Sequence, residues 1–400
     1  MAHTTKQCSY YLKPSKSAVV DMYDSTYVAP AFSGPQPRLG LVTMTKRPLD
    51  LDHWLAYHFH VVGVRKFFIQ VEDSPEVAAL LLAPPWNEFV DVTFVSKTAR
   101  DYFVQMDRQA VHVAASLPRA KAADIDWLIH VDDDELLFCP HGAPAFWATL
   151  ALAPAHVHDV HVANLEALAP GGCAHPFATC TRFIAATSRF TSYTNGKSIG
   201  RVAAPGLRAH GPHHFRSSAP GNAQTLNLDA ACCVVLHYES CTFERWRRKF
   251  GDLAKQHGGD AAVLEKLPFP FYRDSLHCLW RCMHADAAAR PAADAAAFTC
   301  WEARKGEAAT RIAPAELADV FAVRDALATL CPPPAGGDGA PAPAPQERAI
   351  LAPADLLKVP KLTISPPASP GAVGAAAAVE LFVVGTPRPR DVAALRSSRQ

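Results

Sequence analysis

Short apolar runs alternate with segments of helical periodicity between residues 39 and 131. Four of the runs have the length of buried strands: Leu39–Thr45, Lys66–Val71, Phe89–Val95 and Trp127–Val131. Between them, residues 51–62 and 105–117 place apolar side chains three and four positions apart, which predicts amphipathic helices. Strands and helices that alternate in this way form a mostly parallel central sheet flanked by helices. The sequence therefore predicts an α/β fold, in which ligands bind at the carboxyl ends of the strands.

The composition changes after residue 331, where proline, alanine and glycine come to dominate the chain. Such a segment buries too little apolar surface to offset its ordering entropy, so we expect a disordered tail over residues 332–400. The remainder divides into an N-terminal extension (1–38), a principal α/β domain (39–285) and a C-terminal helical extension (286–331).

The charges nearly cancel, with 39 Lys and Arg against 38 Asp and Glu and a net charge of +1. Such a chain has no strong global field that would attract nucleic acid or an anionic membrane. No run of about 18 apolar residues occurs, so we expect no transmembrane segment. The absence of a secretory signal predicts a cytoplasmic protein, and a Golgi location stays open if the N-terminus is truncated.

The eleven cysteines are expected as reduced thiols in that compartment. Cys278, Cys282 and His284 lie close together in the sequence, but their spacing matches no strong zinc-finger pattern. Buried thiols are therefore favoured over a zinc site.

An acidic cluster, Asp132–Glu135, follows the fourth expected strand directly. Four adjacent carboxylates repel one another, and apolar segments on both sides make each ionised group costly. A divalent cation resolves this conflict, because Asp132 and Asp134 alternate along the chain and can offer hard oxygen ligands to Mg²⁺ or Mn²⁺. The alternative is a solvated acidic turn. The position of the cluster at the end of a strand favours a role in binding a metal ion and a diphosphate.

The segment Trp127–Leu137 resembles the Asp-x-Asp region of GT-A glycosyltransferases, and is most similar to glycosyltransferase family 92 and related family-2-like enzymes. Further segments resemble blocks of that group in the same order: Trp54–His58, Phe67–Ser74, Gln105–Gln109, Asn195–Arg201, His210–His214 and Leu236–Tyr238. The first strand departs from the pattern, since it ends Thr45-Lys46-Arg47 where the group has Asn-Glu. The match covers about residues 39–280 and implies a GT-A-like, Rossmann-related domain.

The resemblance implies a hexosyltransferase-like enzyme that takes a nucleotide-sugar donor, a carbohydrate or glycoconjugate acceptor, and Mn²⁺ or Mg²⁺. The expected donor- or nucleotide-binding residues are Thr43, Lys46, Asp73, Gln105, Asp132, Lys197 and Arg201. The expected metal ligands are Asp132, Asp134 and one of the late histidines His213, His214 and His237, with Glu135 beside them. Several of these residues also have an alternative interpretation without a role in binding. The histidines could be ordinary core or loop residues, and Asp73 could cap a turn. Lys197 and Arg201 could be solvated cations of an exposed hairpin.

An inverting transferase needs a general base for the acceptor hydroxyl. Two carboxylates are candidates: Glu166, within an apolar segment, and Glu239, just after His237. Two other functions stay open. One is another metal-dependent phosphate enzyme, such as a nucleotidyltransferase or phosphatase, and the other is an inactive relative that acts as a binding module.

Overall fold

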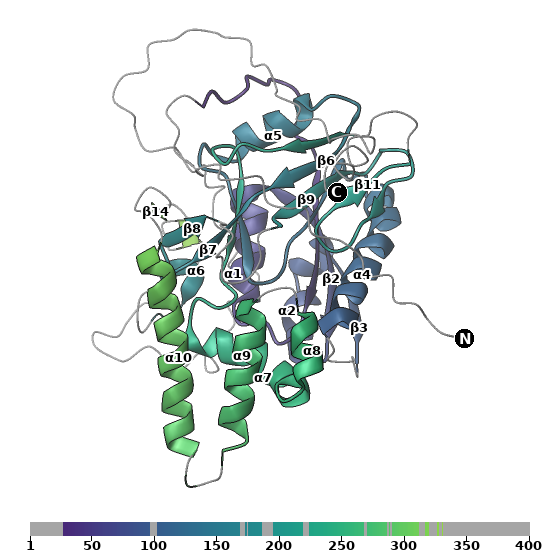
Figure 1. Ribbon diagram of the computed structural model, residues 1–400. Helices are drawn as coiled ribbons and strands as arrows, with labels where there is room; N and C mark the ends of the chain where they lie inside the picture. The colour runs from purple at the N-terminus through teal and green to yellow at the C-terminus, as the bar shows by residue number, and fades with distance from the viewer. Residues whose placement is uncertain are drawn as a thin grey trace, which may run out of the picture.

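A seven-stranded sheet lies at the centre of the computed structural model, in the order β12-β6-β9-β4-β1-β2-β3 (Figure 1). The strand bounds are β1 Leu39–Thr45, β2 Val64–Glu72, β3 Val90–Val95, β4 Trp127–His130, β6 Val157–Val162, β9 Lys197–Arg201 and β12 Gln224–Asn227. Strand β9 pairs antiparallel with both of its neighbours, and every other pairing in this sheet is parallel. The expected α/β class, with a mostly parallel central sheet, is confirmed.

The structure describes residues 27–96, 102–168, 173, 175–185, 195–218, 224–267, 270–285, 288, 290–311, 317–319, 326–327 and 330. The tail expected over residues 332–400 lies outside the described residues. Within the described ranges, the four expected strands all form as β1 to β4, and the helix expected over 105–117 forms the middle of α4.

A second sheet of five strands, which the sequence did not predict, has the order β14-β8-β7-β13-β5. Its strands are β5 Glu135–Phe138, β7 Asn164–Ala167, β8 Arg182–Ala185, β13 Val234–His237 and β14 Leu317–Asp319. Register in this sheet pairs His237 with Glu135 on one side and with Glu166 on the other. The second sheet therefore gathers three polar residues that lie up to 102 positions apart in the chain.

The helices cover the sheets and form one further cluster (Figure 1). Their bounds are α1 Leu51–Tyr57, η1 His58–Val62, η2 Pro75–Val77, α2 Ala78–Leu81, α3 Trp86–Phe89, α4 Tyr102–Ala122, α5 Ala143–Leu152, α6 Pro176–Thr179, α7 Phe243–His257, α8 Ala261–Lys266, α9 Pro270–Met283 and α10 Arg290–Arg311. A short two-stranded sheet joins β10 Arg208–Ala209 to β11 Phe215–Arg216.

Three hydrophobic cores hold the described elements together. The largest core joins both sheets and includes Trp54, Phe67 and Leu136, none of which is exposed to solvent. A second core lies between α7, α9 and α10 and is built on Trp246 and Phe250. The third packs α4 against the first sheet. Each large apolar side chain buried in this way contributes about 1.5–3 kcal/mol, so α7 is held firmly against its neighbours.

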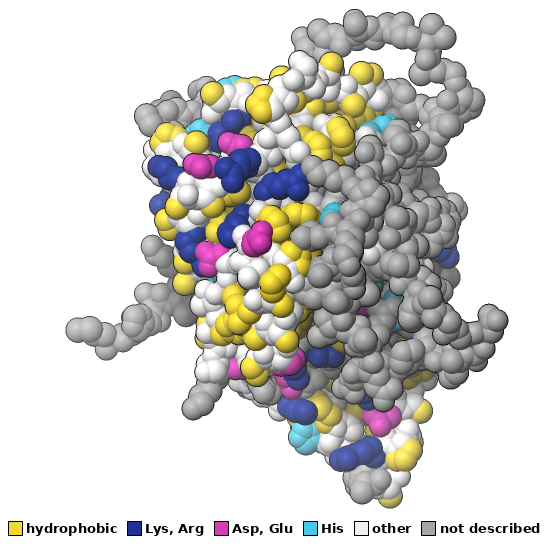
Figure 2. All heavy atoms as spheres, turned by 180° about the vertical axis from the view of Figure 1, so that it is seen from behind, with side chains coloured by type: hydrophobic (Ala, Val, Ile, Leu, Met, Phe, Trp, Pro, Cys, Tyr) yellow, Lys and Arg dark blue, Asp and Glu magenta, His cyan; other side chains and the backbone are white. Residues whose placement is uncertain are grey.

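The surface agrees with the near-zero net charge. Where described side chains are coloured in Figure 2, basic and acidic groups are interspersed rather than segregated. Within the part of the chain that the structure describes, we find no helix that is both long and apolar enough to cross a lipid bilayer.

Candidate active site

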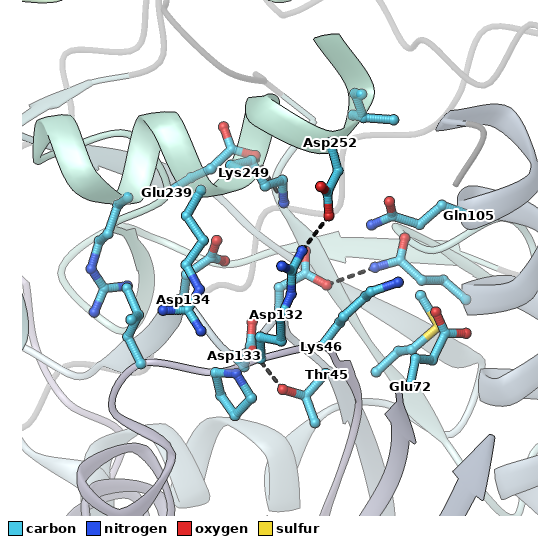
Figure 3. A pocket seen from close by; sticks show the side chains of 18 of the residues that line it. Thr45, Lys46, Glu72, Gln105, Asp132, Asp133, Asp134, Glu239, Lys249 and Asp252 are labelled. Carbon is cyan, nitrogen blue, oxygen red and sulfur yellow. Dashed lines mark hydrogen bonds and ion pairs between the residues drawn. The ribbon is translucent and has the colours of Figure 1, made fainter. Parts of the chain in front are cut away.

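A pocket opens where β1, β2 and β4 end, between the acidic turn 132–134 and helix α7 (Figure 3). Its lining is strongly polar and carries six carboxylates and six cationic side chains: Glu72, Asp132, Asp133, Asp134, Glu239 and Asp252 with Lys46, Arg47, Arg108, Arg245, Arg248 and Lys249. Figure 3 shows Asp134 and Glu239 on one side of the pocket and Glu72 and Gln105 on the other. The pocket thus lies where ligands bind in sheets of this kind.

Helix α1 and the residue after it hold the acidic turn in place through hydrogen bonds. The indole Nε1 of Trp54 donates to the carbonyl oxygens of Asp132 at 3.1 Å and Glu135 at 2.8 Å. One turn later, His58 Nδ1 donates to Trp54 O at 2.9 Å, and its Nε2 accepts from Leu137 N at 3.3 Å. Burial lowers the pKa of His58 to about 3, so this histidine is neutral and both ring nitrogens are used.

The carboxylate of Asp132 is held by neighbouring side chains. Its Oδ2 lies 2.7 Å from Lys197 Nζ, and its Oδ1 accepts from Gln109 Nε2 at 2.8 Å. Lys197 also lies 3.2 Å from Glu135 Oε2, and Glu135 accepts from the backbone N of Asp132 at 2.7 Å. Burial opposes ionisation of Asp132, but Lys197 overrides it and holds the pKa of this aspartate well below its usual range.

Asp133 and Asp134 differ in their surroundings. Thr45 Oγ1 donates to Asp133 Oδ2, and burial together with the neighbouring Asp134 raises the pKa of Asp133 to about 7. By contrast, Asp134 Oδ1 is buried and has no hydrogen-bond partner among the described residues. A buried carboxylate oxygen without a hydrogen bond is costly, and a cation bound to Asp134 would offset that cost.

Asp134, His237 and Glu239 form a candidate metal centre. One ligand atom from each residue lies within 4.8 Å of the others, and Asp134 Oδ1 is 3.7 Å from His237 Nε2. Two carboxylate oxygens and an imidazole nitrogen are a donor set suited to Mn²⁺, and less well to Mg²⁺. The unsatisfied oxygen of Asp134 and this donor set together fit a divalent cation.

Both other members of this centre are oriented by a partner of their own. His237 Nδ1 lies 2.9 Å from Glu166 Oε2. Glu239 Oε1 accepts from Tyr272 OH at 2.8 Å and lies 3.0 Å from Lys249 Nζ. Burial alone would lower the pKa of His237, but the surrounding carboxylates, Glu166 above all, raise it to about 10. A metal ion bound at Nε2 would displace the proton from that nitrogen.

The two carboxylates expected as general bases therefore have different positions. Glu239 lines the pocket and belongs to the candidate metal centre. Glu166 is almost fully buried in β7, hydrogen-bonds to His237 and is not part of the pocket lining. The sequence offered Glu239 as a base and gave no sign that it lies beside Asp134.

The nucleotide-side residues lie at the ends of β1 and β2. Lys46 Nζ is 2.8 Å from Asp73 Oδ2, and both Lys46 and Gln105 line the pocket or its rim. Arg47 and Asp73 have backbone φ values of 50° and 47°, a left-handed conformation that non-glycine residues seldom adopt. Thr43 is fully buried and does not line the pocket.

His213, His214 and Arg201 also do not line the pocket. His213 Nδ1 lies 2.8 Å from Gly196 O, and His214 Nδ1 lies 3.8 Å from Asp159 Oδ2. Neither histidine belongs to the group formed by Asp134. Arg201 pairs with Trp127 at the start of β4, where its guanidinium lies 4.3 Å from the indole centroid and donates to the Val157 carbonyl at 2.9 Å.

Several pocket residues were not identified from the sequence. The most prominent are Arg245, Arg248 and Lys249 on α7, with Asp252 one turn later. Their spacing of three and four positions places them on one face of a helix, and this pattern was the available signal. Thr45, Arg108 and Gln109 also line the pocket.

No family model matches the chain. One protein of Arabidopsis thaliana described as glycosyltransferase-like is 27% identical over 256 residues, which are 52% of this chain and 55% of the relative. This similarity supports a glycosyltransferase-like family. A second Arabidopsis thaliana protein with the same description is 26% identical over 251 residues, 51% of this chain and 47% of the relative. The chain spans about half the length of the curated relatives it matches.

Solved structures add little to this comparison. The crystal structure of 4-diphosphocytidyl-2C-methyl-D-erythritol synthase from Anaerococcus prevotii is 8% identical, covering 42% of this chain and 71% of that chain, with a TM-score of 0.25. A cytidylyltransferase from Leptospira borgpetersenii is 13% identical, covering 32% of this chain and 54% of that chain, with a TM-score of 0.20. At these TM-scores the likenesses carry no argument about function.

Proposed function

We propose that the protein is a metal-dependent glycosyltransferase that moves a sugar from a nucleotide-sugar donor to a hydroxyl group of a carbohydrate or glycoconjugate. The similarity to proteins described as glycosyltransferase-like supports the general class. The observation that carries the finer proposal is the convergence of Asp134, His237 and Glu239, of which Asp134 and Glu239 line a highly charged pocket.

In this proposal Asp134, His237 and Glu239 hold Mn²⁺ or Mg²⁺. A bound divalent cation offsets the negative charge that develops on the leaving diphosphate. Glu166 accepts from His237 Nδ1 and so directs Nε2 towards Asp134. We assign Glu166 this orienting role, instead of that of a general base, because it does not line the pocket.

The remaining side chains prepare the pocket for the donor. Lys197 keeps Asp132, the first residue of the acidic turn, ionised and in place, with Lys197 Nζ 2.7 Å from Asp132 Oδ2. Glu72 accepts hydrogen bonds from Arg108 Nε at 2.8 Å and from Arg108 Nη2 at 2.9 Å. This bidentate pair fixes the orientation of the Glu72 carboxylate at the end of β2. These fixed groups provide an ordered polar surface at the strand ends, where we place the nucleoside.

The experiment is an incubation of the full chain with a panel of nucleotide sugars, with and without Mn²⁺, in which released nucleotide is quantified. A glycosyltransferase releases nucleoside diphosphate, by transfer or by slow donor hydrolysis, and the release needs the metal. Release of inorganic pyrophosphate from a nucleoside triphosphate and a sugar phosphate would instead identify a nucleotidyltransferase. No metal-dependent turnover and no thermal shift with UDP or GDP would favour a binding module.

A further inference from the structure

Five of the six cationic side chains that line the pocket are held by carboxylates. Three pairs have the distances 2.8 Å for Lys46–Asp73, 2.8 Å for Arg108–Glu72 and 3.0 Å for Lys249–Glu239. The other two are the ion pairs Arg47–Asp252 and Arg245–Asp50, which link the segment after β1 to α7. These five cations are neutralised within the protein itself.

Arg248 is the sixth of these cations and is different. Its side chain lines the pocket and is partly shielded from solvent, yet its guanidinium has no hydrogen bond or ion pair within the part of the chain that the structure describes. Burial, and then the like charge of Arg47, lowers its pKa, and the carboxylates of Glu244 and Asp133 offset this only in part. A desolvated cation beside another cation is unfavourable unless an anion joins it.

We propose that Arg248 binds a phosphate oxygen of the donor's diphosphate. Arg248 stands on α7 between Arg245 and Lys249, and Lys249 contacts Glu239 of the candidate metal centre. An anion bound by Arg248 therefore lies in the same pocket as the candidate metal ligands Asp134 and Glu239. A guanidinium presents a planar fork of donors that matches phosphate oxygens. This inference rests on the proposed function. It assigns the diphosphate to α7 instead of to Lys197 and Arg201, the two basic residues of β9 expected to bind the donor.

The same chemistry could come from a second oxyanion, the carboxylate of an acidic donor sugar. The test is therefore isothermal titration of the full chain with inorganic pyrophosphate, with UDP or GDP, and with a nucleotide uronate. Each titration is run with Mn²⁺ and with a chelator. The variant is Arg248→Ala, and the matched control is Arg247→Ala, an exposed arginine on the same helix that lies over the Phe243 ring.

We expect Arg248→Ala to weaken binding of pyrophosphate and nucleoside diphosphate about 10- to 100-fold, because a charge-assisted hydrogen bond is lost. Arg247→Ala should stay within about twofold of the wild type, as surface changes usually do. Unchanged pyrophosphate affinity in Arg248→Ala would overturn the inference. A loss confined to the nucleotide uronate would also overturn it, because the sugar carboxylate would then be the partner.

The outcome separates this inference from the proposed function. If pyrophosphate binding depends on Arg248 but no nucleotide sugar is consumed, the anion site stands and the glycosyltransferase proposal fails. If nucleotide sugars are consumed and Arg248→Ala binds pyrophosphate normally, the proposed function stands and the role of Arg248 fails. Circular dichroism and the thermal midpoint of each variant check that the fold is intact, and Arg248→Lys, which keeps the charge, should recover part of the affinity.

Discussion

The imidazole of His237 and the carboxylate of Glu166 are joined by a buried hydrogen bond of 2.9 Å between Nδ1 and Oε2. The two residues face each other in register across the parallel strands β13 and β7. Because Nδ1 donates to Glu166, Nε2 is the nitrogen that faces Asp134, 3.7 Å away. A carboxylate behind a histidine ligand fixes the ring and raises its basicity.

Replacing Glu166 by Gln should therefore weaken the metal site without removing any ligand. We expect the affinity for Mn²⁺ to fall about 10- to 100-fold, the range typical of lost partners behind metal-bound histidines. Electron paramagnetic resonance of free Mn²⁺ during a titration measures the affinity directly. The control is Glu265→Gln, an exposed change in α8, and equal Mn²⁺ affinity in both variants would contradict the orienting role of Glu166.

Lys197 should be important for stability as well as for the acidic turn. Its ammonium group is almost fully buried and contacts Asp132 at 2.7 Å and Glu135 at 3.2 Å. Lys197→Met leaves the buried carboxylate of Glu135 and the partly exposed carboxylate of Asp132 without their counter-charge. This should lower the free energy of unfolding by about 3 kcal/mol, the lower end of the range for breaking a buried ion pair. Urea unfolding measures this loss. Lys266→Met, at an exposed position, should change stability by less than about 0.5 kcal/mol, and a similarly small effect at Lys197 would refute the argument.

The neutral state of His58 predicts a dependence of stability on pH. Its pKa falls from 6.5 to about 3 on folding, so the unfolded chain binds the extra proton between these values. The contribution of His58 to stability is therefore complete above pH 6.5 and is lost as the pH falls towards 3, by up to about 1.4 kcal/mol per pH unit. Urea unfolding between pH 4 and 7 measures the slope. In His58→Gln the slope should be smaller, and an identical slope would show that His58 is not its source.

The sequence predicted much of the first sheet, because hydrophobic periodicity is a local signal. Strand β1 forms over Leu39–Thr45, as expected, and the acidic turn is separated from the end of β4 by one residue. Trp54 and His58, noted as part of a family resemblance, proved to support that turn through hydrogen bonds to Asp132, Glu135 and Leu137. For these features, the order of strands and helices along the chain was sufficient for the prediction.

The rest of the site depends on contacts between distant segments. His237 was one of three late histidines of similar appearance in the sequence, and only pairing of β13 with β5 and β7 brings it beside Asp134 and Glu166. Lys197 and Arg201 are four residues apart, but they occupy opposite ends of β9, so Lys197 contacts Asp132 while Arg201 lies over Trp127. Sequence spacing alone could not distinguish these two ends.

The most direct test of the central claim is the rate of Mn²⁺-dependent nucleoside diphosphate release from a nucleotide sugar, compared between the wild type and Asp134→Ala. Asp294→Asn, an exposed change in α10, is the control. If Asp134 holds the metal beside the diphosphate, its removal should lower the rate by at least about 100-fold, while the control keeps the wild-type rate. Undiminished metal-dependent release in Asp134→Ala would contradict the account.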